Sequence, residues 1–470
     1  MLPSLAAAQD WIDDLVKPKG PRKSESDKVK PDARKPDKSK TPEKRPSAPR
    51  SGRRPVSVLP RLGRHATLPA RTWNLCAFER DLDMQSQGAI VASDGNVYFF
   101  SSTRSVRHGA VAFRYLTAED RLERLCDDVT TVCGERPGTG WSQGVVSTQP
   151  VGINGWIYWG THSSAANAPT YTGGHVVGWN IGTGEWRDLG VVLEGHTIYA
   201  GLAGDPRANR LYVTASPTSG RQCEPTRLVA LDLEQGKRED LGVVAYGGMI
   251  GYPSLWVDQD GHCWVSAPGG VMIRYNSRKK VLEGWLDGLP YLRTLEGFTH
   301  IDGSLQARRR WWWVSGLRER NRCLLTLKDG TTLYMFSPRR IGLGPGKAFQ
   351  IVTRNVGRPG LACAVSEGRV YYIHREESRD GPNGYVLQLR SVDYTRPLRK
   401  SHNHGVLMDE KGRLPQRIAA LLVEAGRRAY VVGDWTTVQP DPTSLSYDGK
   451  GRYVERKTAQ FFAAVQIPQD

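Results

Sequence analysis

The chain has no run of about 18 to 20 apolar residues, which is the length a helix needs to cross a membrane. It also lacks a Gly-rich phosphate loop, a Walker motif, a nucleophile elbow and a Cys/His zinc ladder. These absences argue against a membrane-spanning protein, a nucleotide-dependent enzyme and a serine hydrolase.

Cysteines are few. The 470 residues contain seven, an odd number at irregular spacing, so a disulfide framework is not implied. Cys126 and Cys133 are close enough in sequence to pair, and a pair of free thiols fits equally well. No cofactor or metal is expected, although a structural metal stays open, because "SHNHG" places His402 and His404 on one side of an extended segment without identified partners.

Aromatic residues are absent from positions 17–54, where 15 Lys/Arg and 5 Asp/Glu supply +10 of the formal net charge of +17. Such a segment cannot bury enough apolar area to offset its backbone entropy, so residues 1–66 are expected to form a disordered basic tail before a folded domain at 67–470. The tail could contact anionic polymers by charge or serve as a solvated spacer, whereas nucleic acid is not an expected partner of the folded domain. The opening "MLPSLAAAQD" resembles the end of a secretory signal without its basic start, which favours an extracellular or periplasmic location.

What the sequence does contain is a repeat of strands with an aromatic anchor after a turn. The anchors are Tyr98, Tyr158, Tyr212, Trp264, Trp313, Tyr371 and Tyr430, at separations of 60, 54, 52, 49, 58 and 59 residues. Seven anchors at this period predict an all-β, seven-bladed β-propeller with about four antiparallel strands per blade.

The remaining strands fit this repeat. "GAVAFRYL", "GHVVGWNI", "TRLVALDL" and "GVMIRYN" are expected as third strands, and the charged "RLERLCD", "EWRDLGV" and "KREDLGV" as outer edges. "TIYAGLAG" and "YPSLWVD" are expected as first strands, and so is "LPQRIAALLVEAG", in preference to a helix. The C-terminal "AQFFAAVQI" is expected to close the ring with N-terminal sequence.

Two histidines fall at one end of the second blade. His162 ends its second strand and His175 opens its third, separated by a loop of twelve residues, longer than the two to five of an ordinary hairpin. In an antiparallel meander, the start of the first strand, the end of the second and the start of the third lie at one end of the sheet. This meander rule brings His196, Tyr252 and Arg221 to the same face as the two histidines. Long loops on a rigid scaffold are where a functional site is expected.

Histidine, tyrosine and arginine suit one reaction in particular. Removing the C5 proton of a uronic acid requires a cation or donor at the carboxylate, a base such as His or Tyr, and an acid for the departing glycosidic oxygen. Hydrolysis would use two carboxylates instead, and no comparable acidic pair stands out at the blade ends.

The runs "WIYWGTHSSAANAPTYTGGHVVGWNIGTGEWRDLG", "GYPSLWVDQDGHCWVSAPGGVMIRYN" and "GRRAYVVGDW" resemble the seven-bladed propeller polysaccharide lyases, ulvan lyases in particular. The resemblance covers about half of the propeller. It implies that His162, His175 and Tyr252 are catalytic and that Arg274 or Arg221 neutralises the substrate carboxylate. The spacing between the two histidines is shorter than the family pattern.

Two further residues are candidates for binding substrate. His196 lies on the same face as the histidine pair, and Trp312 in "RRRWWW" offers a ring that can stack on a sugar. A structural role for His196, or packing of Trp312 between blades, is the competing interpretation. The leading hypothesis is therefore a lyase that cleaves a uronate-containing acidic polysaccharide by β-elimination. The alternative is a non-catalytic propeller that binds or scaffolds glycan or protein partners.

Overall fold

The structure is a computed structural model, and its chain divides into two compact units, residues 1–57 and 58–470. It describes residues 61–165, 168, 170–199, 201–218, 224–245, 255–257, 260–266, 272–284, 324–326, 332–336, 340–343, 351–353, 359–381, 384–393, 401–436, 445–447, 453–455 and 458–468. All of these belong to the second unit; of the tail expected over residues 1–66, residues 1–60 lie outside them, while residues 61–66 form β1 (Arg61–Leu62) and the start of β2 (His65–Asn74) instead of a disordered segment. Among these residues, no helix is long and apolar enough to span a membrane.

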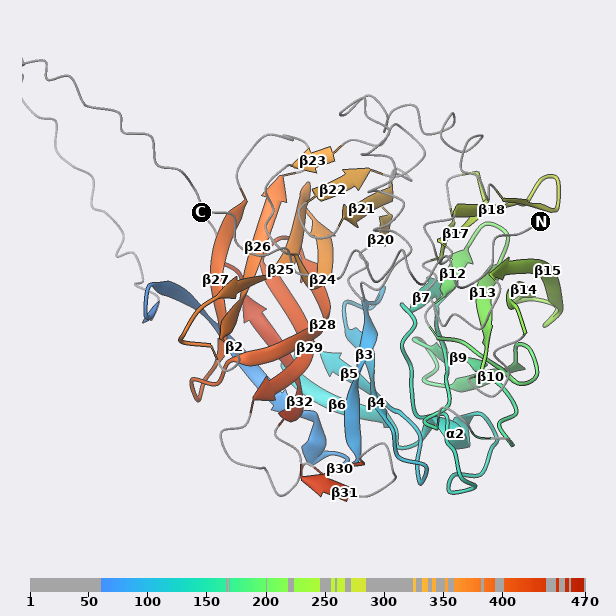
Figure 1. The fold of residues 1–470 in the computed structure, drawn as a ribbon, viewed down its shortest axis with the longest axis horizontal. Coiled ribbons are helices and arrows are strands. Elements are labelled where there is room, and N and C mark those ends of the chain that lie inside the picture. The colour runs from blue at the N-terminus through green and yellow to red at the C-terminus, as the bar shows by residue number, and fades with distance from the viewer. Residues whose placement is uncertain are drawn as a thin grey trace, which may run out of the picture. The chain divides into compact units, whose positions relative to one another are not determined.

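The described residues form a propeller-like, almost entirely β fold, confirming the predicted class (Figure 1). Five sheets follow one another along the chain, each running mostly as a four-stranded antiparallel meander. Their strands are β3 (Leu82–Val91), β4 (Val97–Thr103), β5 (Val111–Leu116) and β6 (Arg121–Cys126); β7 (Val151–Ile153), β8 (Trp156–Gly160), β9 (His175–Asn180) and β10 (Trp186–Val191); β11 (His196–Thr197), β12 (Leu202–Asp205), β13 (Arg210–Pro217), β14 (Thr226–Asp232) and β15 (Arg238–Ala245); β16 (Leu255–Val257), β17 (Cys263–Ser266), β18 (Met272–Asn276) and β19 (Val281–Gly284); and β20 (Leu324–Thr326), β21 (Thr332–Phe336), β22 (Arg340–Leu343) and β23 (Ile351–Thr353).

The last large sheet joins the two ends of the folded unit. Its path runs β24 (Pro359–Ser366), β25 (Arg369–Glu377), β26 (Tyr385–Asp393), β27 (His402–Asp409), β2 (His65–Asn74), β32 (Thr458–Gln466), β29 (Arg428–Thr436) and β28 (Pro415–Glu424), with β1 (Arg61–Leu62) beside β2. β32 pairs antiparallel with both β2 and β29, which confirms the predicted pairing of the C-terminal strand with N-terminal sequence. β27 and β2 pair in parallel, so two four-strand groups form one continuous sheet.

The aromatic anchors are core residues. The six within the described residues are at most 4 % exposed: Tyr98, Tyr158, Tyr212, Trp264, Tyr371 and Tyr430. Trp313 lies outside the described residues. Apolar clusters lie between consecutive sheets, as where Phe100 and Trp159 contact edge to face at 5.1 Å. Anchors with a period of about one sheet therefore predict the core correctly, because each sheet buries a face against the next.

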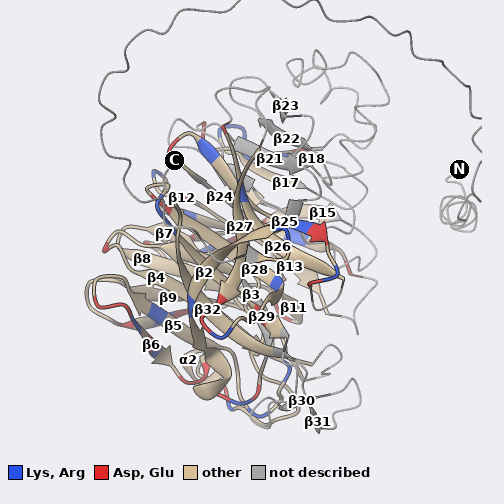
Figure 2. Ribbon diagram, turned by 90° about the vertical axis from the view of Figure 1, so that its left-hand side faces the viewer, with Lys and Arg blue, Asp and Glu red and all other residues tan. Residues whose placement is uncertain are grey.

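Two details differ from the sequence-based expectations, and a third decides between the two alternatives for Cys126 and Cys133. β2 begins at His65, ahead of the expected domain start at residue 67. "TIYAGLAG" is not one strand, since β11 ends at Thr197 and β12 begins at Leu202. Cys126 and Cys133 are free thiols. In the view of Figure 2, short basic and acidic segments are scattered over the described ribbon.

The described residues also contain two short helical segments. η1 spans Leu75–Ala77, and α2 spans Val129–Val132 between β6 and β7. A small hairpin of β30 (Leu445–Tyr447) and β31 (Tyr453–Glu455) lies near the end of the chain.

Candidate functional site

The predicted histidines of the second and third sheets lie on hydrogen-bonded neighbouring segments. Thr161 N donates to His175 O at 2.9 Å, and Gly174 N donates to His196 O at 2.7 Å. His162 forms a bridge with Val145, exchanging backbone hydrogen bonds of 2.8 and 3.0 Å. The meander rule therefore places these three histidines at a common end of the sheets.

His175 is 5 % exposed, and carboxylates hold both of its ring nitrogens. Its Nδ1 lies 2.9 and 3.0 Å from the two carboxylate oxygens of Asp188, and its Nε2 lies 3.2 Å from Glu135 Oε1. Burial alone would lower the pKa of His175, but the hydrogen bonds to Asp188, Cys133 and Glu135 outweigh it and raise the pKa to about 12. In this arrangement His175 has no free ring nitrogen with which to accept a substrate proton.

A β-bulge aims Asp188 at His175. The register of β10 on β9 shifts between Asp188 and Val191, and Gly190 within this shift has φ +77°. Gly190 N donates to Asp188 Oδ1 at 2.8 Å, which fixes the carboxylate. A bulge of this kind redirects a side chain without ending the strand.

Glu135 is fixed by a second set of polar contacts. Its carboxylate accepts from Gln143 Nε2 at 2.9 Å and from the Thr172 hydroxyl. The buried Gln143 also accepts hydrogen bonds from Thr161 Oγ1 at 2.8 Å and Tyr171 OH at 3.1 Å. Burial would raise the pKa of Glu135, but the bonds from His175, Thr172 and Gln143 lower it.

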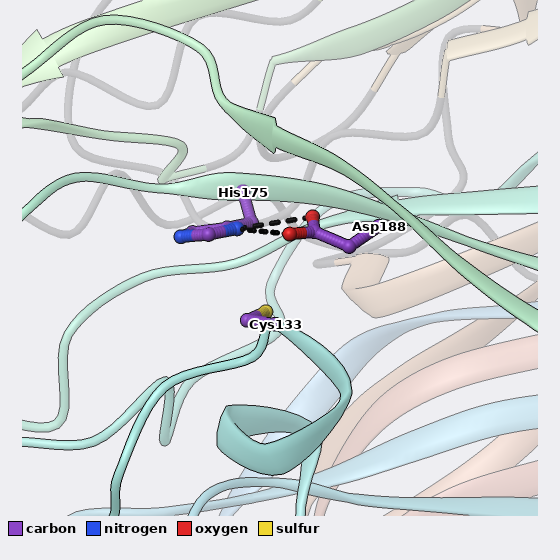
Figure 3. Close-up of side chains that lie close together, drawn as sticks. All are labelled: Cys133, His175 and Asp188. Carbon is purple, nitrogen blue, oxygen red and sulfur yellow. Dashed lines mark hydrogen bonds and ion pairs between the residues drawn. The ribbon is translucent and has the colours of Figure 1, made fainter.

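Cys133 completes this group from the C-terminal end of α2 (Figure 3). The Asp128 side chain caps the helix by accepting from Thr130 N at 2.7 Å, and it also accepts from Gly109 N at 2.8 Å. One ligand atom each from Cys133, His175 and Asp188 lies within 4.8 Å of the others. Burial raises the pKa of the Cys133 thiol to about 11 even though His175 acts to lower it.

His162 differs from His175 in its surroundings and in its protonation. Its ring lies against Tyr199 at a centroid distance of 4.8 Å, and its Nδ1 is buried without a hydrogen-bond partner among the described residues. Burial lowers the pKa of His162 to about 4, so the imidazole is neutral at neutral pH. Tyr199 is fixed in turn by its backbone oxygen, which accepts a hydrogen bond from the Ser147 hydroxyl.

The other predicted site residues divide into two groups. His196 is buried, with Nδ1 3.0 Å from Glu194 O and Nε2 3.6 Å from Glu224. Arg274 pairs with Glu283 on the neighbouring strand and lies 5.3 Å from the Trp264 ring. Tyr252, Arg221 and Trp312 lie outside the described residues.

A second potential metal group lies in the segments before β3 and between β4 and β5, beside the first sheet. Glu79, Asp81 and His108 bring ligand atoms within 4.8 Å of one another, with His108 Nε2 3.6 Å from Glu79 and 3.5 Å from Asp81. His108 Nδ1 lies 2.8 Å from Gly109 O. The ring centroids of His402 and His404 lie 4.5 Å apart with the ring planes tilted by 58°, and neither residue belongs to the two groups of three ligands found among the described residues.

Sequence reasoning missed Glu135, Asp188, Cys133 and Tyr199. Asp188 stands in "EWRDLGV", where it reads as one more charge on an outer edge, and Glu135 stands in an irregular segment with no period. Tyr199 could have been found from its position two residues after the end of β11, because that strand begins with His196 and lies on the same face as the other histidines.

Comparison with known proteins gives structural likeness only. No family model matches the chain, and no curated protein does. A chain of a mitotic checkpoint complex aligns over 90 % of this chain and 98 % of its own length, at 9 % identity and a TM-score of 0.44. A prolyl endopeptidase aligns over 84 % of this chain and 52 % of its own, at 12 % identity and 0.43. A copper-bound fungal alcohol oxidase aligns over 80 % and 73 %, at 11 % identity and 0.42.

Proposed function

We propose that this protein is a polysaccharide lyase that cleaves a uronate-containing acidic polysaccharide by β-elimination. The observation that supports it is the pair of His162 and Tyr199, whose rings lie 4.8 Å apart. A neutral imidazole can accept a proton and a phenol can donate one, and the two groups lie side by side.

In the proposed reaction, His162 accepts the C5 proton of the uronate. The C5–H electron pair forms the C4–C5 double bond, and the bond from C4 to the glycosidic oxygen breaks. Tyr199 gives its proton to that oxygen, and transfer from the protonated His162 restores the phenol. No oxidant or other co-reactant is needed.

The proposal changes the roles predicted from the sequence for His175, for the arginine and for Tyr252. Because His175 is held by Glu135 and Asp188, its role here is to position the loop that carries His162, instead of acting as a base. The carboxylate-neutralising arginine is assigned to Arg221, since Arg274 is already paired with Glu283. Tyr252 remains a second candidate for the acid.

The finer architecture is also proposed. The five sequential sheets and the two four-strand groups joined through β27 and β2 correspond to seven blades. The basic tail would hold the acidic polymer near the propeller, and an extracellular or periplasmic location fits such a substrate.

The test is an activity screen on ulvan, pectin, alginate and glycosaminoglycans, following the absorbance of the unsaturated product. With the active substrate, His162→Ala and Tyr199→Phe should each lower kcat by about 10²- to 10⁴-fold, the usual contribution of a general acid or base. His402→Ala, which removes a partly buried histidine from β27, is the matched control. Turnover unchanged in both site variants would contradict the assignment.

A non-catalytic glycan-binding propeller is the second candidate. It is favoured by His175 and Arg274, two residues expected to touch substrate whose polar groups are already paired within the fold. This candidate predicts affinity for an acidic polysaccharide without product formation, and loss of binding when residues 17–55 are deleted. Product formation would exclude it.

A further inference from the structure

We propose that Cys133, His175 and Asp188 form a binding site for one transition-metal ion of the zinc type, with Glu135 orienting the histidine. The three residues come from separate elements, namely the end of α2 and strands β9 and β10. No proton transfer of the proposed elimination takes place at this site, where His175 only positions the loop that carries His162.

The ligand set is the first argument. A thiolate, an imidazole and a carboxylate together match the donors that proteins use for Zn²⁺. With bond lengths of about 2.0 to 2.3 Å, tetrahedral ligand atoms lie about 3.5 Å apart. The observed atoms lie within 4.8 Å of one another, so a small side-chain adjustment would bring all three to one ion.

The outer contacts are the second argument. A metal-bound histidine usually gives its other ring N–H to a carboxylate, which fixes the ring. Glu135 stands 3.2 Å from His175 Nε2, on the side opposite Asp188, and Gln143 holds it in turn at 2.9 Å. The Gly190 N–H fixes Asp188 in the same manner.

Charge and access are the third argument. Two carboxylates flank one imidazole in a largely buried group, and among the described residues neither makes an ion pair with a lysine or arginine. The excess negative charge favours a cation. The side chain of Asp188 is 22 % exposed, whereas that of His175 is 6 % exposed, so an ion would enter past Asp188.

Cobalt(II) is the probe, because thiolate ligation gives it an intense near-ultraviolet charge-transfer band. The full-length protein, stripped with a chelator and desalted, is titrated with Co²⁺ and then with Zn²⁺. We expect the band to saturate at one equivalent and to disappear as Zn²⁺ displaces Co²⁺. The group of Glu79, Asp81 and His108 has no thiol and cannot produce this band.

Variants locate the ion. Cys133→Ser should abolish the band, Asp188→Asn should weaken Co²⁺ binding at least tenfold, and Glu135→Gln should keep the band while losing about 10- to 100-fold in affinity. Cys126→Ser, at a partly exposed cysteine of the same sheet region, is the matched control. Circular dichroism confirms that each variant is folded.

Absence of the band in the wild type, or its survival in Cys133→Ser, would overturn the proposal. Because the readout is spectroscopic, the result is independent of lyase activity. A protein that binds cobalt with Cys133 and cleaves no polysaccharide would retain the metal site and lose only the proposed function.

Discussion

Two histidines at one end of the second sheet differ in protonation because their neighbours differ: His162 is neutral and His175 is charged at neutral pH. His162 lies beside an aromatic ring with its Nδ1 buried and, among the described residues, has no carboxylate partner, so its charged form is penalised and its pKa is lowered. His175 is buried, but Asp188 and Glu135 stabilise its charged form and raise its pKa. The same residue type is therefore suited to accept a proton in one place and to hold a loop in the other.

The low pKa of His162 predicts a pH-dependent stability. In the unfolded chain a histidine binds a proton below about pH 6.5, whereas folded His162 does so only below about pH 4. Between these values the unfolded state holds more protons, so the free energy of unfolding falls as the pH drops through this window. The loss amounts to roughly 3 kcal/mol at most.

Urea unfolding of the wild type and of His162→Gln, at pH 7 and at pH 4, measures this term. The variant should lose less stability than the wild type on acidification, while His402→Gln should behave like the wild type. An equal loss in wild type and His162→Gln would show that the imidazole is not buried in its neutral form.

At the scale of elements, a four-residue helix is too short to be stable alone, so its capping contacts decide whether it forms. Asp128 caps α2 and also binds Gly109 N, joining the helix to the loop before β5. Asp128→Ala should therefore lower the free energy of unfolding by about 1 to 2 kcal/mol. It should also weaken Co²⁺ binding, because Cys133 lies at the other end of the same helix.

The neighbouring residue supplies the control for this helix. The side chain of Asp127 is 76 % exposed and forms a surface ion pair with Arg124 at 2.7 Å. Exposed pairs of this kind contribute about 0 to 1 kcal/mol, so Asp127→Ala should leave both readouts nearly unchanged. Chemical unfolding and cobalt titration on the two variants give the comparison, and equal effects would show that the cap is not what stabilises α2.

At the scale of the whole molecule, the sequence predicts those features that repeat. The third and outer strands and the buried anchors recur at one period per sheet, and they appear where expected, as Tyr212 in β13 does. The parallel pairing of β27 with β2 joins residues more than three hundred positions apart, and no local pattern specifies it. The polar group around His175 was missed for a similar reason, since Glu135 and Asp188 meet it only through tertiary packing.

β32 joins N-terminal and C-terminal strands in one sheet, so the folded unit should depend on it. The strand lies between β2 and β29, and Phe461 and Phe462 on it are at most 1 % exposed. Deleting residues 458–470 would remove two ladders of hydrogen bonds, expose two strand edges and empty two aromatic sites, each costing about 3 to 5 kcal/mol.

We expect this truncated protein to be unfolded or aggregated in size-exclusion chromatography and far-ultraviolet circular dichroism. Deleting only residues 468–470 keeps the buried Ile467, whose N–H donates to Arg427 O at 2.7 Å, and should leave the unfolding midpoint unchanged. If the longer truncation also yields a monomer that unfolds cooperatively, β32 does not close the fold, and the rest of the sheet is stable without it.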